Sequence, residues 1–366
     1  MIVRFVLGLI LALVSLTAQA QGTWTAWVYS PADGSVVRIS AQGEIIDAYR
    51  LPLSPAFNAY GIAALTSPNG RFVAYTAIDT ITGGGNQQLV VYDTQAGVIR
   101  FTYDLTGVDT DGLSFARFPH SSAFDENAQT LAFGVVRGGD WELVVANLAN
   151  ETLSGGAPLT ADEAGLEHGN MLPIPEIVRG NAVRFFLLPL GTSYFREYAA
   201  NLWTPGQAVV EVGASSAFSD ILPRSGEIAT PVYDPDLPTA ATSDGPVLAY
   251  NTVDLVQNGR IAMLHDSSID IAQVWWIGGG SQLLLQGFDT GINADVLKVY
   301  GRDGVLAGQF SGGLRDIQGA PDGFVGLFPS GGGVGIAYVA TFGGAFSSST
   351  IWTTGDPAAR LIHVQG

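Results

Sequence analysis

Acidic and imidazole side chains are the residues of this sequence whose types could make a functional site. The chain has 33 Asp and Glu residues but only four His. Carboxylate oxygens can bind Ca²⁺, and a protonated acid beside a charged partner can hydrolyse a glycosidic bond. The candidates share a position between short apolar runs: they are Asp111, His120, Glu167, His168, Asp220, Asp270 and Asp316.

Other signatures of catalysis are missing from the sequence. A serine hydrolase needs the pattern G-x-S-x-G, and the segments 191–195 and 213–217 both fail at the final glycine. There is no Cys, and the four His do not have a metal-ligand spacing. No motif therefore requires a cofactor, and Ca²⁺ is the one ion that the acidic composition leaves open.

The charge balance excludes some partners. The formal net charge is −17, and Lys298 is the only lysine. Nucleic acid and anionic lipid both require a basic surface. We therefore expect no nucleic-acid partner, and a protein or a small ligand instead.

The first 20 residues have the pattern of a signal peptide. Arg4 precedes an apolar run from Phe5 to Leu16, and the small residues Ala18 and Ala20 frame a cleavage site. No second apolar segment of spanning length follows. We expect residues 1–20 to be cleaved and residues 21–366 to form a single exported domain, monomeric, without a membrane segment, and secreted or in the periplasm or cell envelope.

The remaining sequence indicates an all-β protein that is built from repeats. Short β-branched and aromatic runs alternate with Gly, Pro, Asn and Asp clusters, and helical periodicity is scarce. One complete unit runs from the turn Ser67–Gly70 through the strands Phe72–Ala77 and Leu89–Tyr92. Less regular copies of this unit recur at intervals of roughly 45–50 residues, a spacing typical of four-stranded propeller blades.

A second periodic mark agrees with the first one. Asp220, Asp270 and Asp316 each stand in a similar context ahead of a copy of the unit. Together the two marks predict seven blades, although six or eight would also fit the worn stretch from Leu159 to Asp244. The predicted blades are Gly22–Leu53, Ser54–Gly107, Val108–Pro158, Leu159–Gly213, Ala214–Ser267, Ser268–Gly312 and Gly313–Gly366.

The first predicted blade is one strand short. It has only three strand-forming runs, which begin at Trp24, Val36 and Glu44. A strand from the far end of the chain could complete this blade and close the ring, which removes exposed sheet edges. We therefore expect the C-terminal strands, Ser349–Thr353 and Arg360–Val364, to pair with the N-terminal blade.

The unit at Ser67–Tyr75 (SPNGRFVAY) resembles the S-P-D-G repeat of TolB-like, WD-like bacterial β-propellers. Leu89–Asp93 resembles the following strand of that repeat, and Ala320–Gly323 resembles another copy of its turn. Asn69 departs from the pattern, in which Asp is usual. The resemblance implies a propeller fold and transfers no catalytic residue, since function is not set by fold.

In such a propeller, the connections between blades would bring the seven candidate residues to the mouth of the central funnel. An Asp that precedes a strand usually accepts hydrogen bonds from nearby backbone N–H groups, which is a structural role. The sequence therefore favours a non-enzymatic module for binding or scaffolding. Two alternatives stay open: a carbohydrate-active hydrolase that uses the funnel carboxylates, and a propeller stabilised by Ca²⁺.

Overall fold

The computed structural model describes most of the chain after residue 22. Its described residues are 23–82, 85–117, 123–190, 197–216, 218–222, 225–232, 241–242, 245–246, 250–256, 260–311, 313–341 and 347–366. The predicted signal peptide, residues 1–20, lies outside them, so its cleavage and the export of the chain stay predictions. Among the residues that the structure covers, no helix has the length and apolar character needed to cross a bilayer.

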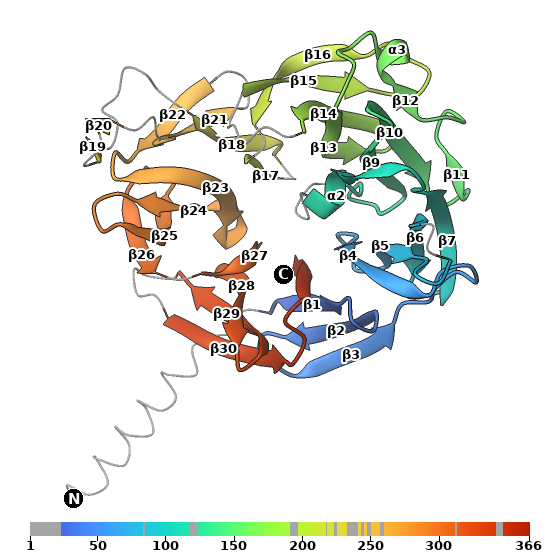
Figure 1. Ribbon diagram of the computed structural model, residues 1–366. Coiled ribbons are helices and arrows are strands. Elements are labelled where there is room, and N and C mark those ends of the chain that lie inside the picture. The colour runs from blue at the N-terminus through green and yellow to red at the C-terminus, as the bar shows by residue number, and fades with distance from the viewer. Residues whose placement is uncertain are drawn as a thin grey trace, which may run out of the picture.

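Seven antiparallel sheets surround a central axis and form a β-propeller, as predicted (Figure 1). The strands of the first four blades are β1 (Thr25–Ser30), β2 (Ser35–Ser40) and β3 (Ile45–Arg50); β4 (Ala59–Thr66), β5 (Phe72–Ile78), β6 (Gln87–Asp93) and β7 (Val98–Asp104); β8 (Val108–Leu113), β9 (Thr130–Arg137), β10 (Asp140–Asn147), β11 (Thr152–Leu153) and β12 (Leu159–Thr160); and β13 (Met171–Arg179), β14 (Ala182–Pro189), β15 (Glu197–Trp203) and β16 (Val210–Ser216).

The later blades follow the same plan. Their strands are β17 (Asp220–Leu222), β18 (Glu227–Val232), β21 (Thr252–Val256) and β22 (Arg260–His265); β23 (Ile269–Ile277), β24 (Gln282–Asp289), β25 (Ala294–Gly301) and β26 (Leu306–Ser311); and β27 (Arg315–Ala320), β28 (Gly323–Ser330), β29 (Gly333–Ala340) and β30 (Ser347–Thr354). The pair β19 (Ala241–Thr242) and β20 (Gly245–Pro246) lies between β18 and β21. The described helices are short: α2 (Ser114–Arg117), α3 (Ala161–Ala164) and the 3₁₀ turn η1 (Gly278–Gly280).

The last strand of the chain closes the ring. Strand β31 (Arg360–Gln365) pairs antiparallel with β1, with Thr25 opposite Gln365 and Tyr29 opposite Arg360. It supplies the innermost strand of blade 1, in the order β3-β2-β1-β31. The predicted closure is confirmed for this strand, whereas the other expected donor, Ser349–Thr353, lies in β30 and belongs to blade 7. The C-terminus therefore lies at the centre of the ring (Figure 1).

The turn Ser67–Gly70 is the hairpin between the inner strand and the second strand of blade 2. Asn69 Oδ1 accepts hydrogen bonds from Ser67 Oγ at 2.8 Å and from the Arg71 N–H at 3.1 Å. Gly70 has a φ of +70°, and a Cβ there would lie 2.8 Å from the Trp27 ring of blade 1. Glycine is needed at this position both for its backbone angle and for the close approach of the neighbouring blade.

Apolar side chains between the blades form the core. Separate buried clusters join blades 1 and 2, 2 and 3, 3 and 4, 5 and 6, 6 and 7, and 7 and 1. Burial of such side chains contributes roughly 25 cal/mol per Å² of apolar surface. In the part of the chain that the structure covers, no equivalent cluster joins blades 4 and 5. These two blades contain most of the stretch from Leu159 to Asp244, where the sequence repeat is least regular.

The predicted blade boundaries hold with two corrections. Ala214–Ser216 were assigned to blade 5, but they end β16, which pairs with β15, and so they belong to blade 4. Leu159 and Thr160 were assigned to blade 4, but β12 pairs with β10 and so belongs to blade 3. Thr160 then caps α3: its side chain accepts from the Glu163 N–H, and the Glu163 side chain accepts from the Thr160 N–H. This capping box diverts the chain before it enters blade 4, which is why the boundary lies later than the repeat spacing predicted.

Candidate functional site

A pocket lies on the central axis, where the inner strands turn back into the second strands of their blades. We call it the channel-mouth pocket, and its volume is about 240 Å³. Thr66 ends β4, Arg179 ends β13, and Trp275 lies near the end of β23. The complete lining is Leu65, Thr66, Pro68, Ala123, Phe124, Glu126, Ile177, Val178, Arg179, Asp220, Ile221, Trp275, Ile317, Gln318, Gly319, Ile362 and His363.

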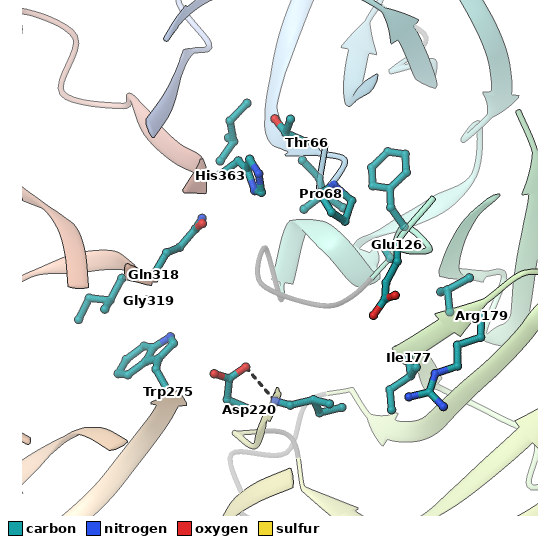
Figure 2. A pocket seen from close by; sticks show the side chains of 17 residues that line it. Thr66, Pro68, Glu126, Ile177, Arg179, Asp220, Trp275, Gln318, Gly319 and His363 are labelled. Atoms are coloured by element: carbon teal, nitrogen blue, oxygen red, sulfur yellow. Dashed lines mark hydrogen bonds between the residues drawn. The ribbon is translucent and has the colours of Figure 1, made fainter. Parts of the chain in front are cut away.

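Polar side chains are distributed around the whole rim of this pocket. In Figure 2, Trp275 and Gln318 lie on one side, Glu126 and Arg179 lie on the other, and Asp220 lies between the two groups. These side chains come from different blades, because each inner strand contributes its last residues to one face of the ring. The pocket therefore exists only when the ring is closed.

Asp220 is the acid that is held most firmly in the channel-mouth pocket. Its Oδ2 accepts a hydrogen bond from the Trp276 backbone N–H in the next blade at 2.7 Å, and its Oδ1 accepts from the Ile221 N–H at 2.9 Å. Burial raises the pKa of Asp220 to about 6, although both hydrogen bonds oppose that change. This carboxyl group consequently changes its charge close to neutral pH.

His363 faces the same pocket from β31. Its ring lies 5.0 Å from the Trp27 ring, between centroids. Burial lowers the pKa of His363 to about 4, against the opposing effect of a hydrogen bond with the Pro68 backbone. The imidazole is therefore neutral at physiological pH.

The lining also holds polar atoms that the protein itself does not satisfy. Among the described residues, Thr66 Oγ1, Trp275 Nε1 and His363 Nε2 are buried without a hydrogen-bond partner. Leaving such a group unpaired costs about 1–3 kcal/mol. Three unpaired groups in the lining of one pocket make it the best candidate for a ligand site in the described structure.

The seven residues proposed from the sequence do not form one site. Asp220 lines the channel-mouth pocket, whereas Glu167, His168, Asp270 and Asp316 do not. Asp111 lies in β8, but its side chain is outside the described part of the structure, and His120 is outside it altogether.

Asp270 and Asp316 make contacts between blades. Asp270 Oδ1 accepts from the Tyr250 N–H at 3.0 Å, and burial raises the pKa of Asp270. Asp316 forms a two-point ion pair with Arg360, at 2.7 and 3.1 Å, and accepts from the Leu361 N–H at 3.2 Å. Both acids connect neighbouring blades through backbone N–H groups.

Glu167 and His168 lie beside α3, which Figure 1 shows at the outer rim of the ring. The Glu167 carbonyl accepts a hydrogen bond from Trp141 Nε1 at 2.8 Å. His168 Nε2 is 3.3 Å from Asp162, and His168 Nδ1 is 3.8 Å from Asp140. The side chains of His168, Asp162 and Asp140 are all more than half exposed, so these contacts contribute little to stability.

Thr66, Glu126, Arg179, Gln318 and His363 were not predicted from the sequence. Trp276 lies in the core, beneath the Arg302 guanidinium at 4.7 Å from the ring centroid. Trp275 packs in the next core cluster but also lines the pocket. Thr66, Glu126 and Arg179 are each close to a turn that ends an inner strand, so the turn signals were the available clue.

A second polar cluster differs from the pocket in its pairing. We call it the Lys298 cluster. Lys298 Nζ donates to Asp266 Oδ2 at 2.8 Å and to Ser268 Oγ at 2.7 Å, and it lies 2.9 Å from Asp289 Oδ2. Tyr300 also donates to Asp266. Burial would raise the pKa of Asp266, but the hydrogen bonds from Lys298, Ser268 and Tyr300 hold it far below its usual range.

Neither a protein-family model nor a curated protein sequence matches this chain. Solved structures do match it. Prolyl oligopeptidase B from Galerina marginata, bound to a 35mer hydrolysis and macrocyclization substrate, is 12% identical with a TM-score of 0.56, and the match covers 91% of this chain and 51% of that one. The Pyrococcus horikoshii acylaminoacyl peptidase is 10% identical with a TM-score of 0.51, covering 87% and 47%.

TolB from Acinetobacter baumannii is also among the similar structures. It is 14% identical with a TM-score of 0.43, and the match covers 78% of this chain and 62% of TolB. The sheet topology of the structure itself confirms the β-propeller part of the predicted resemblance, whereas its WD-like part stays a prediction. This chain spans about half the length of the peptidases that it matches.

These comparisons correct the function that the sequence favoured. A non-enzymatic binding or scaffolding module was expected, but the similar solved structures are mostly prolyl oligopeptidases and acylaminoacyl peptidases. The alternative of a propeller stabilised by Ca²⁺ stays a prediction. Within the described residues, no group of three or more His, Asp or Glu side chains could hold a metal ion. In fold, the chain is a seven-bladed β-propeller.

Proposed function

We propose that this chain is a peptidase-type propeller whose central channel takes in peptide substrates for hydrolysis. The observation that carries the proposal is the channel-mouth pocket, which lies on the propeller axis and is lined by unpaired polar groups. The similarity in fold to prolyl oligopeptidases supports peptide as the class of ligand, and one of those structures is bound to a 35mer substrate.

The chemistry of the lining suits a peptide main chain. An amide group offers one acceptor and one donor. The Trp275 indole N–H is a donor, the Thr66 hydroxyl both donates and accepts, and the neutral His363 ring retains an acceptor nitrogen. Apolar side chains such as Leu65, Phe124 and Ile362 would contact the side chains of the peptide. A pocket of this mixed character can hold a short extended segment.

The share of the reaction that we assign to the propeller is intake of the substrate. No residue of the channel-mouth pocket is assigned as a nucleophile, because the sequence has no nucleophile-elbow motif. The pocket would select unfolded segments, since a folded domain is far larger than about 240 Å³. Peptides that enter would then be hydrolysed by groups outside the described propeller.

The proposal can be tested with an unstructured peptide that carries a photo-reactive side chain. We expect cross-links to residues of the channel-mouth pocket, identified by mass spectrometry, and we expect Glu126→Trp to reduce them several-fold because the exposed Glu126 side chain lines the pocket. Glu44→Trp is the matched control, since Glu44 is equally exposed but lies in the turn between β2 and β3. Shortened peptides are measured in the same reactions.

Two results would contradict the proposal. One is cross-linking that is confined to the outer strands, and the other is cross-linking to the pocket that Glu126→Trp leaves unchanged. If the protein also shortens the peptide, Glu126→Trp should slow that hydrolysis in parallel with binding, and Glu44→Trp should not.

A further inference from the structure

We propose that the corner of the channel-mouth pocket formed by Asp220 and Trp275 is a subsite for an organic cation that the peptide carries. The cation is a guanidinium or ammonium side chain, or the amino terminus. The presence of a peptide in the pocket rests on the proposed function. The positive charge of the group that binds here is argued from the geometry of Asp220 and Trp275.

First, most other acids with side-chain partners in this molecule are paired with basic side chains. Six buried or partly buried carboxylates have a basic partner within ion-pair distance, whereas the buried acids Asp79 and Asp125 accept hydrogen bonds from backbone N–H groups instead. The ion pairs are Asp93 with Arg71, Glu176 with Arg184, Glu227 with Arg302, Asp266 and Asp289 with Lys298, and Asp316 with Arg360. Asp220 has only the N–H groups of Trp276 and Ile221 among the described residues. Asp220 is partly buried, and a carboxylate withdrawn from water without a basic partner is costly, so a cation from a ligand would reduce that cost.

The second argument is the unused capacity of the Asp220 carboxylate. Its two oxygens offer about four lone-pair sites. The two backbone hydrogen bonds occupy one site on each oxygen and fix the orientation of the group. Each oxygen therefore retains capacity to accept a hydrogen bond from a cation in the pocket, and the carboxylate is already oriented before the ligand arrives.

The third argument is the position of Trp275 beside this acid. Both side chains line the pocket (Figure 2), and Asp220 Oδ2 accepts a hydrogen bond from the backbone N–H of Trp276, the residue that follows Trp275. An indole ring attracts cations through its face. Trp275 is only 6% exposed, and its indole N–H is buried without a partner among the described residues. A side-chain movement that opens the indole N–H to the pocket would let a peptide carbonyl next to the cation satisfy it.

The other charged groups that face the pocket do not neutralise Asp220. Glu126 and Arg179 lie across the pocket from Trp275 and have opposite charges, and His363 is neutral because burial lowers its pKa to about 4. With Asp220 ionised, the lining has a net negative charge. Because burial raises the pKa of Asp220 to about 6, the affinity for a cation should fall as the pH drops through that value.

The experiment measures the binding of small probes to the full chain by isothermal titration calorimetry. Nα-acetyl-arginine amide carries the guanidinium without a free amino terminus, and Nα-acetyl-citrulline amide is its neutral counterpart of similar shape. Alanyl-alanine amide, with and without an N-acetyl group, tests the amino terminus as the source of the charge. Asp220→Asn is compared with the control Asp270→Asn, because Asp270 also accepts a backbone N–H and has a raised pKa but does not line the pocket.

We expect at least one cationic probe to bind about tenfold more tightly than its neutral counterpart. Asp220→Asn should abolish that preference, and Asp270→Asn should retain it. In the wild-type protein, the affinity for the cationic probe should fall about tenfold between about pH 7.5 and about pH 5, as Asp220 is protonated. This pH series tests the proposal even if Asp220→Asn fails to fold.

Equal affinities for the charged and neutral probes would overturn the inference, as would a preference that survives in Asp220→Asn. Its failure is distinguishable from failure of the proposed function. Peptides that cross-link to the pocket without any preference for cations would refute only the cation subsite. If the binding of cationic probes depends on Asp220 but no peptide cross-links to the pocket, only the intake of peptides would be refuted.

Discussion

The Lys298 cluster and the channel-mouth pocket both hold buried polar groups, but only the cluster is internally paired. Lys298 contacts two carboxylates and a hydroxyl, and it is 2% exposed. The pocket contains Asp220 without a basic partner and two ring nitrogens without any partner, all among the described residues. A buried polar group that is satisfied by the protein contributes to the fold, whereas one that is left unsatisfied is available to a ligand.

The same difference appears in the pKa values of the acids. The hydrogen bonds around Asp266 hold its pKa far below the usual range despite burial, whereas burial raises the pKa of Asp220 to about 6. Perturbed acids in a cleft mark functional sites more often than acids in structural ion pairs. A raised pKa alone does not separate the two roles, because burial also raises the pKa of Asp270, which connects blades; what distinguishes Asp220 is that it also lines the pocket.

Removal of the cluster's cation should have the largest effect. Lys298→Met leaves Asp266 and Asp289 buried without a positive charge, so we expect the free energy of unfolding to fall by about 3–5 kcal/mol. Urea denaturation followed by tryptophan fluorescence measures it. The exposed Arg50→Met should change stability by less than about 1 kcal/mol. A loss for Lys298→Met no larger than that of the control would show that the cluster is not structural.

Removal of one acid from each region compares them directly. Asp289→Asn leaves Lys298 paired with Asp266, and we expect a loss of about 1–3 kcal/mol at neutral pH. Asp220→Asn removes a charge that has no cation, so its cost should be smaller by about 1 kcal/mol or more. Denaturation midpoints of the two variants test this ranking, and the reverse order would refute the distinction between the two regions.

The pH dependence of stability should identify Asp220 by its sign. Its pKa is raised in the folded state, so the folded protein binds the proton more tightly, and this contribution to stability is lost as the pH rises from about 4 to about 6. His363 acts oppositely over that range, because its pKa is lowered to about 4 and its contribution is lost as the pH falls. We expect the stability of wild type relative to Asp220→Asn to fall by about 1–2 kcal/mol between about pH 4 and pH 7.

Urea denaturation of both proteins at the two pH values measures this difference, and the contribution of His363 cancels between them. Parallel stabilities over the whole range would mean that Asp220 is not buried as an uncompensated acid.

The smallest expected effect compares two tryptophans with unpaired indole nitrogens. Trp275 lines the pocket, whereas Trp24 lies in the core between blades 7 and 1. Replacing either by Phe removes a donor without a partner, so we expect less than about 1 kcal/mol of change from the lost hydrogen-bonding group. Only Trp275→Phe should weaken peptide cross-linking, by a few-fold. Equal weakening by Trp24→Phe would point to a general loss of packing.

The sequence predicted the architecture well because the repeat signals are local. The Ser67–Gly70 turn and the apolar runs around it carry the information for one blade, and Asp220, Asp270 and Asp316 mark three others. The boundary at Leu159 was wrong because β12 is only two residues long and is followed by a capped helical turn. Short elements of this kind leave little periodicity to read.

The candidate site was predictable only in part. Asp220 was named from its spacing, but Asp270 and Asp316, which share that spacing, have structural contacts instead. Asp316 differs from Asp220 because Arg360 of β31 reaches it, whereas no arginine or lysine reaches Asp220 in the described structure. Asp270 also lacks a basic partner among the described residues, but it does not line the pocket. His363 and Thr66 lie on β31 and β4, the inner strands of adjacent blades, which only closure of the ring brings together, so no local pattern could have shown that they share a pocket.

The most direct test of the central claim, that the unpaired groups of the pocket serve a peptide ligand, is an NMR titration of the indole N–H signals. The protein has seven Trp residues, so ¹⁵N labelling of tryptophan gives a short set of signals, and Trp275→Phe and Trp24→Phe assign the two that matter. On addition of an unstructured peptide that contains arginine, the account predicts a saturable shift of the Trp275 signal while the Trp24 signal stays fixed. A Trp275 signal that does not move when the peptide binds would contradict it.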